Sequence, residues 1–341
     1  MEKIYKTPFI DLFMVKTNYE EHCQFMRNST TLDDYPKIEG YNFDNKFNLK
    51  KFLISLKHTG FQASNLGYGI DIINKMIKDK SEIMLSMTGN VISSGLREII
   101  KYLCKNKKIN VIVTSAAGIE EDLVKCFKPF VIGDFDIQGK FLFENGVGRI
   151  GNIFVPFDRY LYFEKFIDPL LEKIFIENNR KPMITSELIK RLALELKNKN
   201  SYLYWAAKNN IDVYCPAIDD GAFGDLLYFF KQKHPEFVID TMSDRNKITN
   251  YCINAKKLGA ILLGGGISKH YLLNANILRE GLDYAVYMTT AHEFDGSDSG
   301  GNQEEAKTWA KIKVNAPTVK IKCEFTIGFP LLVAGSFANS D

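Results

Sequence analysis

The stretch that decides the fold is Ile83-Met84-Leu85-Ser86-Met87-Thr88-Gly89-Asn90, a short apolar run that ends in a turn of small polar residues. A stretch with apolar residues three and four apart follows it, as in a helix. The next unit repeats the scheme, because Asn110-Val111-Ile112-Val113 ends at Thr114-Ser115-Ala116-Ala117-Gly118 before another helical stretch. Short apolar strands that alternate with helices are typical of a parallel sheet covered on both faces. The sequence therefore predicts an α/β fold with a Rossmann-like, doubly wound parallel sheet.

The same pattern extends along most of the chain. Residues 48–56 and 69–77 have helical spacing, and residues 213–215, 260–263 and 284–288 have the composition of further strands. Each strand ends at a loop rich in Gly, Asp or Thr, and ligands of such sheets bind at the carboxyl ends of the strands. No Pro/Ser-rich linker divides the chain. We therefore expect an N-terminal arm, residues 1–36, with at most one short helix, and a single large domain, residues 37–341.

Composition excludes several classes of protein. The 44 Lys and Arg residues against 41 Asp and Glu residues leave a net charge of +3, which argues against a basic nucleic-acid-binding face. No apolar run approaches the roughly 18 residues that a membrane span needs, so no membrane association is expected. The six cysteines are far apart and form no CxxC, which predicts reduced thiols in a cytoplasmic protein and no metal site.

One glycine motif is misleading. Gly146-Val147-Gly148-Arg149-Ile150-Gly151 matches the dinucleotide fingerprint GxGxxG. The fingerprint functions only where a helix N-terminus follows to receive the pyrophosphate. Here the strand-like run Asn152-Ile153-Phe154-Val155-Pro156 follows instead, so we expect no cofactor role for it.

Two other loops are better candidates for binding phosphate. Residues 89–95 and 115–118 are rich in small residues, follow a strand and precede a helix, although an ordinary strand-to-helix turn has the same appearance. Gly264-Gly265-Gly266 permits close approach either to a ligand or to a neighbouring segment. His270, at the expected start of the next helix, is a candidate general base because its ordinary pKa is near neutral.

The segment from residue 294 to 313 combines acids, an indole and a lysine. Residues 294–301 form either a surface turn or a carboxylate clamp for a cation, with too few carboxylates for a calcium loop. Glu305 and Trp309 are spaced to share one helix face, which suits a polyamine through charge pairing and cation–π contact. Lys311, crowded by neighbouring lysines where the helix is expected to change to an alternating strand, could form a Schiff base. The alternative is an amphipathic helix with solvated charges.

Taken together, these segments resemble the deoxyhypusine synthase family over residues 40–334. The matching residues are Gly60-Phe61-Gln62-Ala63-Ser64-Asn65, Asn90-Val91-Ile92-Ser93-Ser94-Gly95-Leu96-Arg97-Glu98, Gly118-Ile119-Glu120-Glu121-Asp122-Leu123, Arg149-Ile150-Gly151-Asn152, Asp220-Gly221, Gly224-Asp225, Gly264-Gly265-Gly266, Lys269-His270, residues 293–300 and residues 305–311. So many matches in one order are more specific than any single motif.

The resemblance implies a homotetramer that binds NAD and shares its active sites between paired subunits. It implies that NAD oxidises spermidine to an imine and that 1,3-diaminopropane leaves. The aminobutyl group then moves to an enzyme lysine and on to one lysine of the precursor of the hypusine-bearing translation initiation factor, where NADH reduces the imine.

The resemblance also implies site residues by position. Lys311 would be the nucleophile and His270 the proton acceptor. NAD would contact Gly89, Asn90, Val91, Ile92, Ser93, Ser115, Ala116, Ala117, Glu121, Asp220, Gly265, Thr290, Ala291, Glu324 and Phe325. Spermidine would contact Glu120, Glu121, Asp225, His270, Asn274, Gly296, Ser297, Asp298, Glu305, Trp309 and Lys311.

Three positions depart from the family pattern, all on the cofactor side. Gly89 stands where Ser is common, Ala117 replaces a Gly, and Glu324-Phe325 replaces an Asp-Ala pair.

Three alternative functions stay open. One is a homospermidine synthase, which takes putrescine as its acceptor. Another is a non-catalytic subunit that activates a paralogue, against which the intact Lys311, His270 and Trp309 argue. The third is a plain NAD-dependent dehydrogenase, which would release NADH in step with product.

Overall fold

The computed structural model describes residues 32–339. The chain divides into two units, and the larger one begins at Gly40. Of the smaller unit only residues 32–39 are described, and they contain a turn in which the Tyr35 N–H donates to the Leu32 carbonyl (3.0 Å). The short helix expected in the arm therefore falls mainly outside the described residues.

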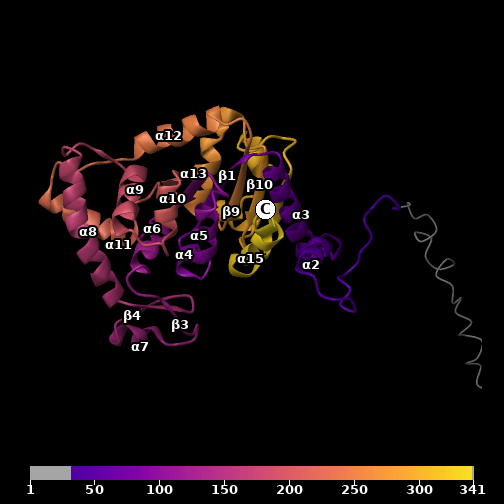
Figure 1. The fold of residues 1–341 in the computed structure, drawn as a ribbon, viewed down its shortest axis with the longest axis horizontal. Helices are drawn as coiled ribbons and strands as arrows, with labels where there is room; N and C mark the ends of the chain where they lie inside the picture. Colours follow the sequence, from indigo (N-terminus) through magenta and orange to yellow (C-terminus); the bar gives the residue numbers. More distant parts are fainter. Residues whose placement is uncertain (1–31, 340–341) are drawn as a thin grey trace, which may run out of the picture. The chain divides into compact units, whose positions relative to one another are not determined.

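A six-stranded parallel sheet forms the centre of the larger unit (Figure 1). Its strands lie in the order β11-β10-β9-β1-β2-β7. The chain builds outward from β1 through β2 to β7, then returns to the other side of β1 and builds through β9 and β10 to β11. The direction of building reverses between β1 and β9, which makes this the topological switch point of a doubly wound sheet. The predicted fold class is confirmed. The strands are β1 (Glu82–Met87), β2 (Val111–Thr114), β7 (Asp212–Tyr214), β9 (Leu258–Leu263), β10 (Tyr284–Met288) and β11 (Thr318–Ile321).

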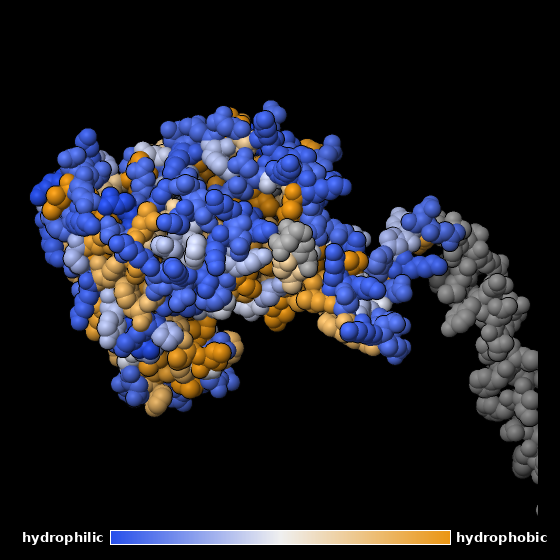
Figure 2. All heavy atoms as spheres, in the orientation of Figure 1, coloured by the Kyte–Doolittle hydropathy of each residue, from blue (hydrophilic) through white to orange (hydrophobic). Residues whose placement is uncertain are grey.

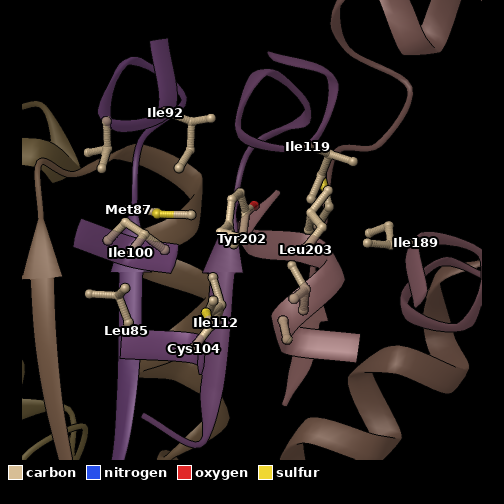
Figure 3. Packing of buried hydrophobic residues seen from close by; sticks show 14 of the residues in the cluster. Leu85, Met87, Ile92, Ile100, Cys104, Ile112, Ile119, Ile189, Tyr202 and Leu203 are labelled. Atoms are coloured by element: carbon tan, nitrogen blue, oxygen red, sulfur yellow. The ribbon is translucent and has the colours of Figure 1, made fainter. Parts of the chain in front are cut away.

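Helices cover both faces of the sheet. Alternate residues of a strand point to opposite faces, so Leu85 packs in one core cluster and Met84 in the other. Figure 3 shows Leu85, Met87 and Ile112 on the first face. Both faces are dry, which is why the strands are apolar throughout. The first face is covered by α3 (Phe61–Lys78), α5 (Arg97–Lys105), α10 (Tyr202–Lys208) and α15 (Phe325–Gly335), and the second by α12 (Thr241–Asn254) and α13 (Gly266–Ala275).

Several elements extend the sheet's ends or flank it. The predicted early helices are present as α2 (Leu49–Ser55) and α3. Sequence patterns did not reveal a further layer of helices and a short two-stranded sheet, packed through a cluster of phenylalanines that includes Phe163, Phe175 and Phe223. These elements are α8 (Asp158–Glu177), α9 (Thr185–Leu196), α11 (Gly221–Lys233), β6 (Met183–Ile184) and β8 (Ile239–Asp240).

The GxGxxG segment belongs to a small antiparallel sheet. Strand β4 (Val147–Ile150) pairs with β5 (Ile153–Pro156), which pairs with β3 (Val131–Ile132). Gly151 takes a positive φ of 59° at the turn of the hairpin. The expectation that a strand follows the motif is confirmed. Together with α7 (Gly139–Glu144) this sheet forms a lobe that exposes apolar side chains, namely Ile132, Phe135, Phe141 and Phe143 (Figure 2).

The segment after the sheet's fifth strand differs from the sequence expectation. It contains two short 3-10 turns, η5 (Glu293–Asp295) and η6 (Asp298–Gly300), and the helix α14 (Gln303–Thr308). The prediction of a strand after Trp309 is wrong, because only an isolated bridge between Leu282 and Ile312 forms there. The chain turns back beneath the start of β10 and enters the sheet only at β11.

No helix among the residues that the structure describes is long and apolar enough to cross a membrane. The cysteines at positions 104, 126, 215, 252 and 323 are free, and Cys23 lies outside the described residues.

Candidate functional site

The loops that the sequence singled out lie at one edge of the sheet. Residues 89–93, 115–117, 264–265, 290–291 and 324–325 each follow the carboxyl end of a parallel strand. Strands β1 and β9 are neighbours, so the Gly89 loop and the Gly264 loop flank the switch point, where dinucleotides bind in sheets of this kind. A parallel sheet places the loops that follow its strands at one edge, and the strand order decides which of these loops are neighbours.

Glycines at this edge allow close packing between loops. A Cβ on Gly264, whose φ is +77°, would lie 2.7 Å from Thr88 Cγ2. A Cβ on Gly265 would lie 2.4 Å from the Cα of Ser299, and the Gly266 N–H donates to Ser299 Oγ (3.0 Å). Of the two roles left open for the triple glycine, the structure thus shows close packing against the 298–300 turn.

Two buried carboxyls lie next to the cofactor-candidate loops. Glu120 and Glu121 are consecutive residues of α6 (Ala116–Val124) and are only 6% and 3% exposed. Burial raises the pKa of Glu120 to about 6 and that of Glu121 to about 7. The Ser93 hydroxyl donates to Glu121 Oε2. The Phe223 N–H donates to Glu120 Oε2 (2.8 Å), so Glu120 also satisfies the first turn of α11.

Further acids surround Glu120. Asp220 precedes α11 and Asp225 lies in its second turn, and both side chains are exposed. Their negative charges add to the burial that raises the pKa of Glu120. Four of the predicted ligand-binding acids, Glu120, Glu121, Asp220 and Asp225, are therefore gathered at the ends of β2 and β7. A cluster of this charge is suited to a cationic ligand.

The neighbouring Asp122 points the other way. It pairs with buried Arg97 (Nε to Oδ1, 2.6 Å) and accepts hydrogen bonds from Ser201 Oγ and the Tyr202 N–H. Asp122 therefore has a structural role.

His270 and Asn274 lie one turn apart on α13. The Asn274 amide nitrogen is 3.0 Å from His270 Nδ1, and the His270 side chain is exposed. Arg245 donates to the Asn274 carbonyl (3.2 Å). His270 lies inside the helix and not at its start as expected.

Two buried lysines hold the acidic turn that carries Asp298. Lys269 Nζ donates to the carbonyls of Asp298 and Gly301 (3.2 Å for Gly301) and lies 3.6 Å from Asp298 Oδ2. Lys320 Nζ donates to the Gly300 carbonyl (2.6 Å) and pairs with Glu293 (3.0 Å). Neither lysine had a predicted role. Because three of these five contacts are to main-chain carbonyls of residues 298–301, the lysines fix the position of the turn that bears Gly296, Ser297 and Asp298.

Lys311 differs from the lysines around it. Lys307 pairs with Glu304 and Lys313 with Asp283, both at 2.7 Å. In the part of the chain that the structure describes, the Lys311 amine has no hydrogen-bond or ion-pair partner, and the residue is half-buried. Trp309, which ends α14, is 64% exposed. An amine with no partner among the described residues, two positions along the chain from an exposed indole, is available to a ligand.

One chain does not bring Lys311 to the cofactor-candidate loops. The Leu282 N–H donates to the Lys311 carbonyl (3.1 Å), and Leu282 precedes the first residue of β10. Thr290 follows the other end of β10. The five residues of that strand separate these points by about 17 Å. Lys311 thus lies toward the edge where the strands begin, whereas Gly89, Ser115 and Glu121 lie at the edge where they end.

The fit to a dinucleotide can be tested on the loops themselves. Helix α6 begins after Ser115 with no side-chain cap. The Gly118 N–H donates to the Ser115 carbonyl (3.0 Å), which leaves the N–H groups of Ala116 and Ala117 available to a phosphate. Glu121 and Asp220 are carboxyls of the type that bind ribose hydroxyls. By contrast, the Glu324 carboxylate accepts from the Thr326 N–H (2.9 Å) and caps its own helix, which leaves main-chain groups for a ligand there. The residues present fit NAD.

Comparisons with known proteins agree with one another. The family model described as deoxyhypusine synthase matches residues 51–336. The chain is 45% identical over 333 residues to a deoxyhypusine synthase of Musa acuminata, covering 89% of each chain. It is also 43% identical over 330 residues to a homospermidine synthase of Senecio vernalis, again covering 89% of each. A crystal structure of an Entamoeba histolytica chain assigned as a deoxyhypusine synthase superposes with a TM-score of 0.63 at 30% identity, covering 89% of this chain and 98% of that one.

Proposed function

Because this chain belongs to the deoxyhypusine synthase family, we propose that it transfers the aminobutyl group of spermidine to a lysine of the translation initiation factor precursor, with NAD as its cofactor. The observation that carries this proposal is that the chain holds both a partly buried acid cluster at the dinucleotide edge and, apart from it, Lys311, whose amine has no partner among the described residues. The acids suit a polyamine and the amine suits imine chemistry.

The residues of this chain divide the work as follows. Residues 89–93, 115–117 and 290–291, with Glu121, Asp220, Gly265 and residues 324–325, hold NAD, which when bound accepts a hydride from spermidine and later returns it. Glu120, Asp225, Asp298 and Glu305 pair with the ammonium groups of spermidine, and Trp309 packs on its methylene chain. His270, oriented by Asn274, accepts the proton released as the amine is oxidised.

Lys311 then performs the transfer. Its amine attacks the carbon of the substrate imine, the bond to the departing nitrogen breaks, and 1,3-diaminopropane leaves with a proton. The aminobutyl group is now an imine on Lys311. The lysine of the precursor displaces Lys311 by the same exchange, and reduction of the product imine completes the reaction. Lys311 must carry no proton at the moment of attack.

The separation of Lys311 from the loops supports active sites shared between paired subunits of a homotetramer. In such an assembly the loops and acids of one chain meet Lys311 of a partner. The apolar side chains exposed on the lobe of β3, α7 and β4 are consistent with burial against another copy. We expect this assembly to act in the cytoplasm.

A homospermidine synthase is the second candidate, and the 43% identity to one is the observation that favours it. Both reactions load Lys311 in the same way and differ only in the acceptor amine. The features of the site described above serve either acceptor.

The test is a competition between acceptors. Spermidine labelled in its aminobutyl part is incubated with the protein, NAD, the precursor protein and putrescine, and Lys311→Ala is run in parallel. Label on the precursor's lysine is the expected result. Label in homospermidine would replace the proposal with the second candidate. NADH released in step with product would indicate a plain dehydrogenase, and an absence of all transfer would indicate a non-catalytic subunit.

A further inference from the structure

The short helix α4 (Asn90–Ser93) is held in place by side chains of another element. Four residues are too few for a helix to be stable alone. Its main-chain bonds are local, as in the Ile92 N–H to the Gly89 carbonyl (2.8 Å). The stability of α4, and with it the position of the Gly89 loop, must therefore come from tertiary contacts.

Besides the burial of Val91 and Ile92 in the core, Lys125 supplies three of these contacts. Its Nζ donates to the carbonyls of Ile92 (2.8 Å), Ser93 (3.2 Å) and Ser94 (3.0 Å). An ammonium group has three donors, and here each has its own carbonyl. These carbonyls end α4, where the main chain carries partial negative charge and a cation is stabilising. The ammonium is matched in both number and charge to the end of this one helix.

The surroundings of Lys125 would disfavour its charge if the ammonium had no hydrogen-bond partners. The residue is only partly exposed, and burial lowers the pKa of its amine. Arg97 adds a repulsive charge, while Glu98, Glu121 and Asp122 add attractive ones. Glu121 lies one helical turn before Lys125 and accepts from the Ser93 hydroxyl. The two side chains thus hold the same end of α4 from one face of the segment around α6.

We propose that Lys125 is a positioning residue for the cofactor, which fixes the α4 segment and the Gly89 loop in the conformation that binds NAD. This inference rests on the proposed function, which assigns residues 89–93 to NAD. Lys125 acts through the main chain of α4. The spacing of four residues in the sequence indicates that Lys125 shares a helix face with Glu121. The spacing does not show that the amine turns toward residues 92–94.

The experiment compares Lys125→Met with Lys128→Met as a matched control. Lys128 is three residues further on and pairs with Asp158 (2.8 Å), so its removal costs a lysine without touching α4. Amide hydrogen exchange is measured first, in the protein without ligand. We expect residues 91–94 to exchange about tenfold faster in Lys125→Met and unchanged in Lys128→Met.

Binding and kinetics are measured on the same variants. Lys125→Met is expected to weaken NAD binding about tenfold, with the KM for spermidine within twofold of the wild type, and Lys125→Arg is expected to recover part of the loss. A general loss of structure would not separate the two ligands in this way. If Lys125→Met does not fold, Lys125→Gln, which keeps one amide donor group, takes its place.

The outcomes separate the inference from the function on which it rests. Unchanged exchange in residues 91–94 would overturn the anchoring role of Lys125. Faster exchange with unchanged NAD affinity would overturn its role toward the cofactor. Failure of the wild-type protein to bind NAD would refute the proposed function and with it the cofactor role, while the exchange data would still decide whether Lys125 anchors α4.

Discussion

Gly89 and Ala117 are packed so closely that only one of the two positions has room for a side chain. A Cβ on Gly89 would lie 2.4 Å from the Cβ of Ala117 and 3.1 Å from Ser115 Oγ. At both positions the sequence departs from the family pattern, with Gly in place of Ser at position 89 and Ala in place of Gly at position 117. The close contact couples the two departures, because a side chain fits on one of the two loops but not on both.

This contact predicts a coupled pair of substitutions. Gly89→Ser should displace the loop, destabilise the protein by about 1–3 kcal/mol and weaken NAD binding, because the two side chains overlap. Gly89→Ser with Ala117→Gly should recover most of both losses. Urea unfolding and NAD titration of the two single variants and the double variant measure the coupling. Strictly additive effects would show that the loops are not in contact.

Lys311→Ala should abolish aminobutyl transfer and leave NAD affinity within twofold of the wild type, because the amine is the attacking group and lies away from the dinucleotide edge. Lys311→Arg should also be inactive, since a guanidinium keeps the charge and does not form the imine. Lys313→Ala, which removes the lysine paired with Asp283, is the matched control and should retain transfer. Normal transfer by Lys311→Ala would contradict the assignment.

Two individually impaired variants should complement each other if active sites are shared. Lys311→Ala lacks the nucleophile, and Asp225→Asn lacks one acid of the cluster that a partner's Lys311 would meet. Co-assembled mixed oligomers should recover roughly a quarter of native transfer, because half of randomly formed pairs are mixed and each mixed pair has one intact site. Mixing Lys311→Ala with the double variant Lys311→Ala/Asp225→Asn provides the control, which should recover nothing. Mixed oligomers that form and stay inactive would argue for sites within single chains.

Stability should fall as the pH rises because of Glu121. Its pKa of about 7 in the folded protein exceeds the ordinary 4.5, so folding favours the protonated form. The stabilisation is fully present below pH 4.5 and is lost as the pH rises through about 7. Glu121→Gln has no carboxyl to ionise at this position. Its free energy of unfolding, relative to that of the wild type, should therefore rise by about 1–3 kcal/mol between pH 4.5 and pH 8.

Urea unfolding at the two pH values measures this gain, and Glu98→Gln, which removes an exposed carboxyl, controls for net charge. An equal pH dependence for the wild type and Glu121→Gln would show that Glu121 titrates normally.

Asp122 should matter for stability and not for ligand binding. Asp122→Ala leaves the buried guanidinium of Arg97 unpaired and should cost about 3–5 kcal/mol. Replacing both partners, as in Arg97→Leu/Asp122→Leu, should cost less than the single change, because no buried charge is left alone. Chemical denaturation compares them. If Asp122→Ala were more stable than Arg97→Leu/Asp122→Leu, the ion pair would not be the main interaction of either residue.

The sequence by itself determined the alternation of strands and helices, and hence the α/β class. Strands buried on both faces must be apolar throughout, so residues 83–87 and 284–288 could be recognised without a structure. It also predicted that a strand and not a helix follows the GxGxxG segment, because the residues after the motif favour a strand. It did not predict α8 or α9, whose apolar residues pack against neighbours far away in the chain.

Only the tertiary structure decided which candidate residues share a surface. The parallel direction of the strands brings residues 89, 115, 265, 290 and 324 to one edge, and the strand order, which local propensity does not encode, makes the loops after β1 and β9 neighbours. The same packing turned Glu121 toward Ser93 and Asp122 toward Arg97, although the two acids are adjacent in the sequence. It also placed Lys311 at the other edge, because the bridge between Leu282 and Ile312 turns the chain beneath the start of β10 before β11 forms. Contacts between residues distant in the chain depend on how helices and strands pack, and that packing is a property of the whole fold.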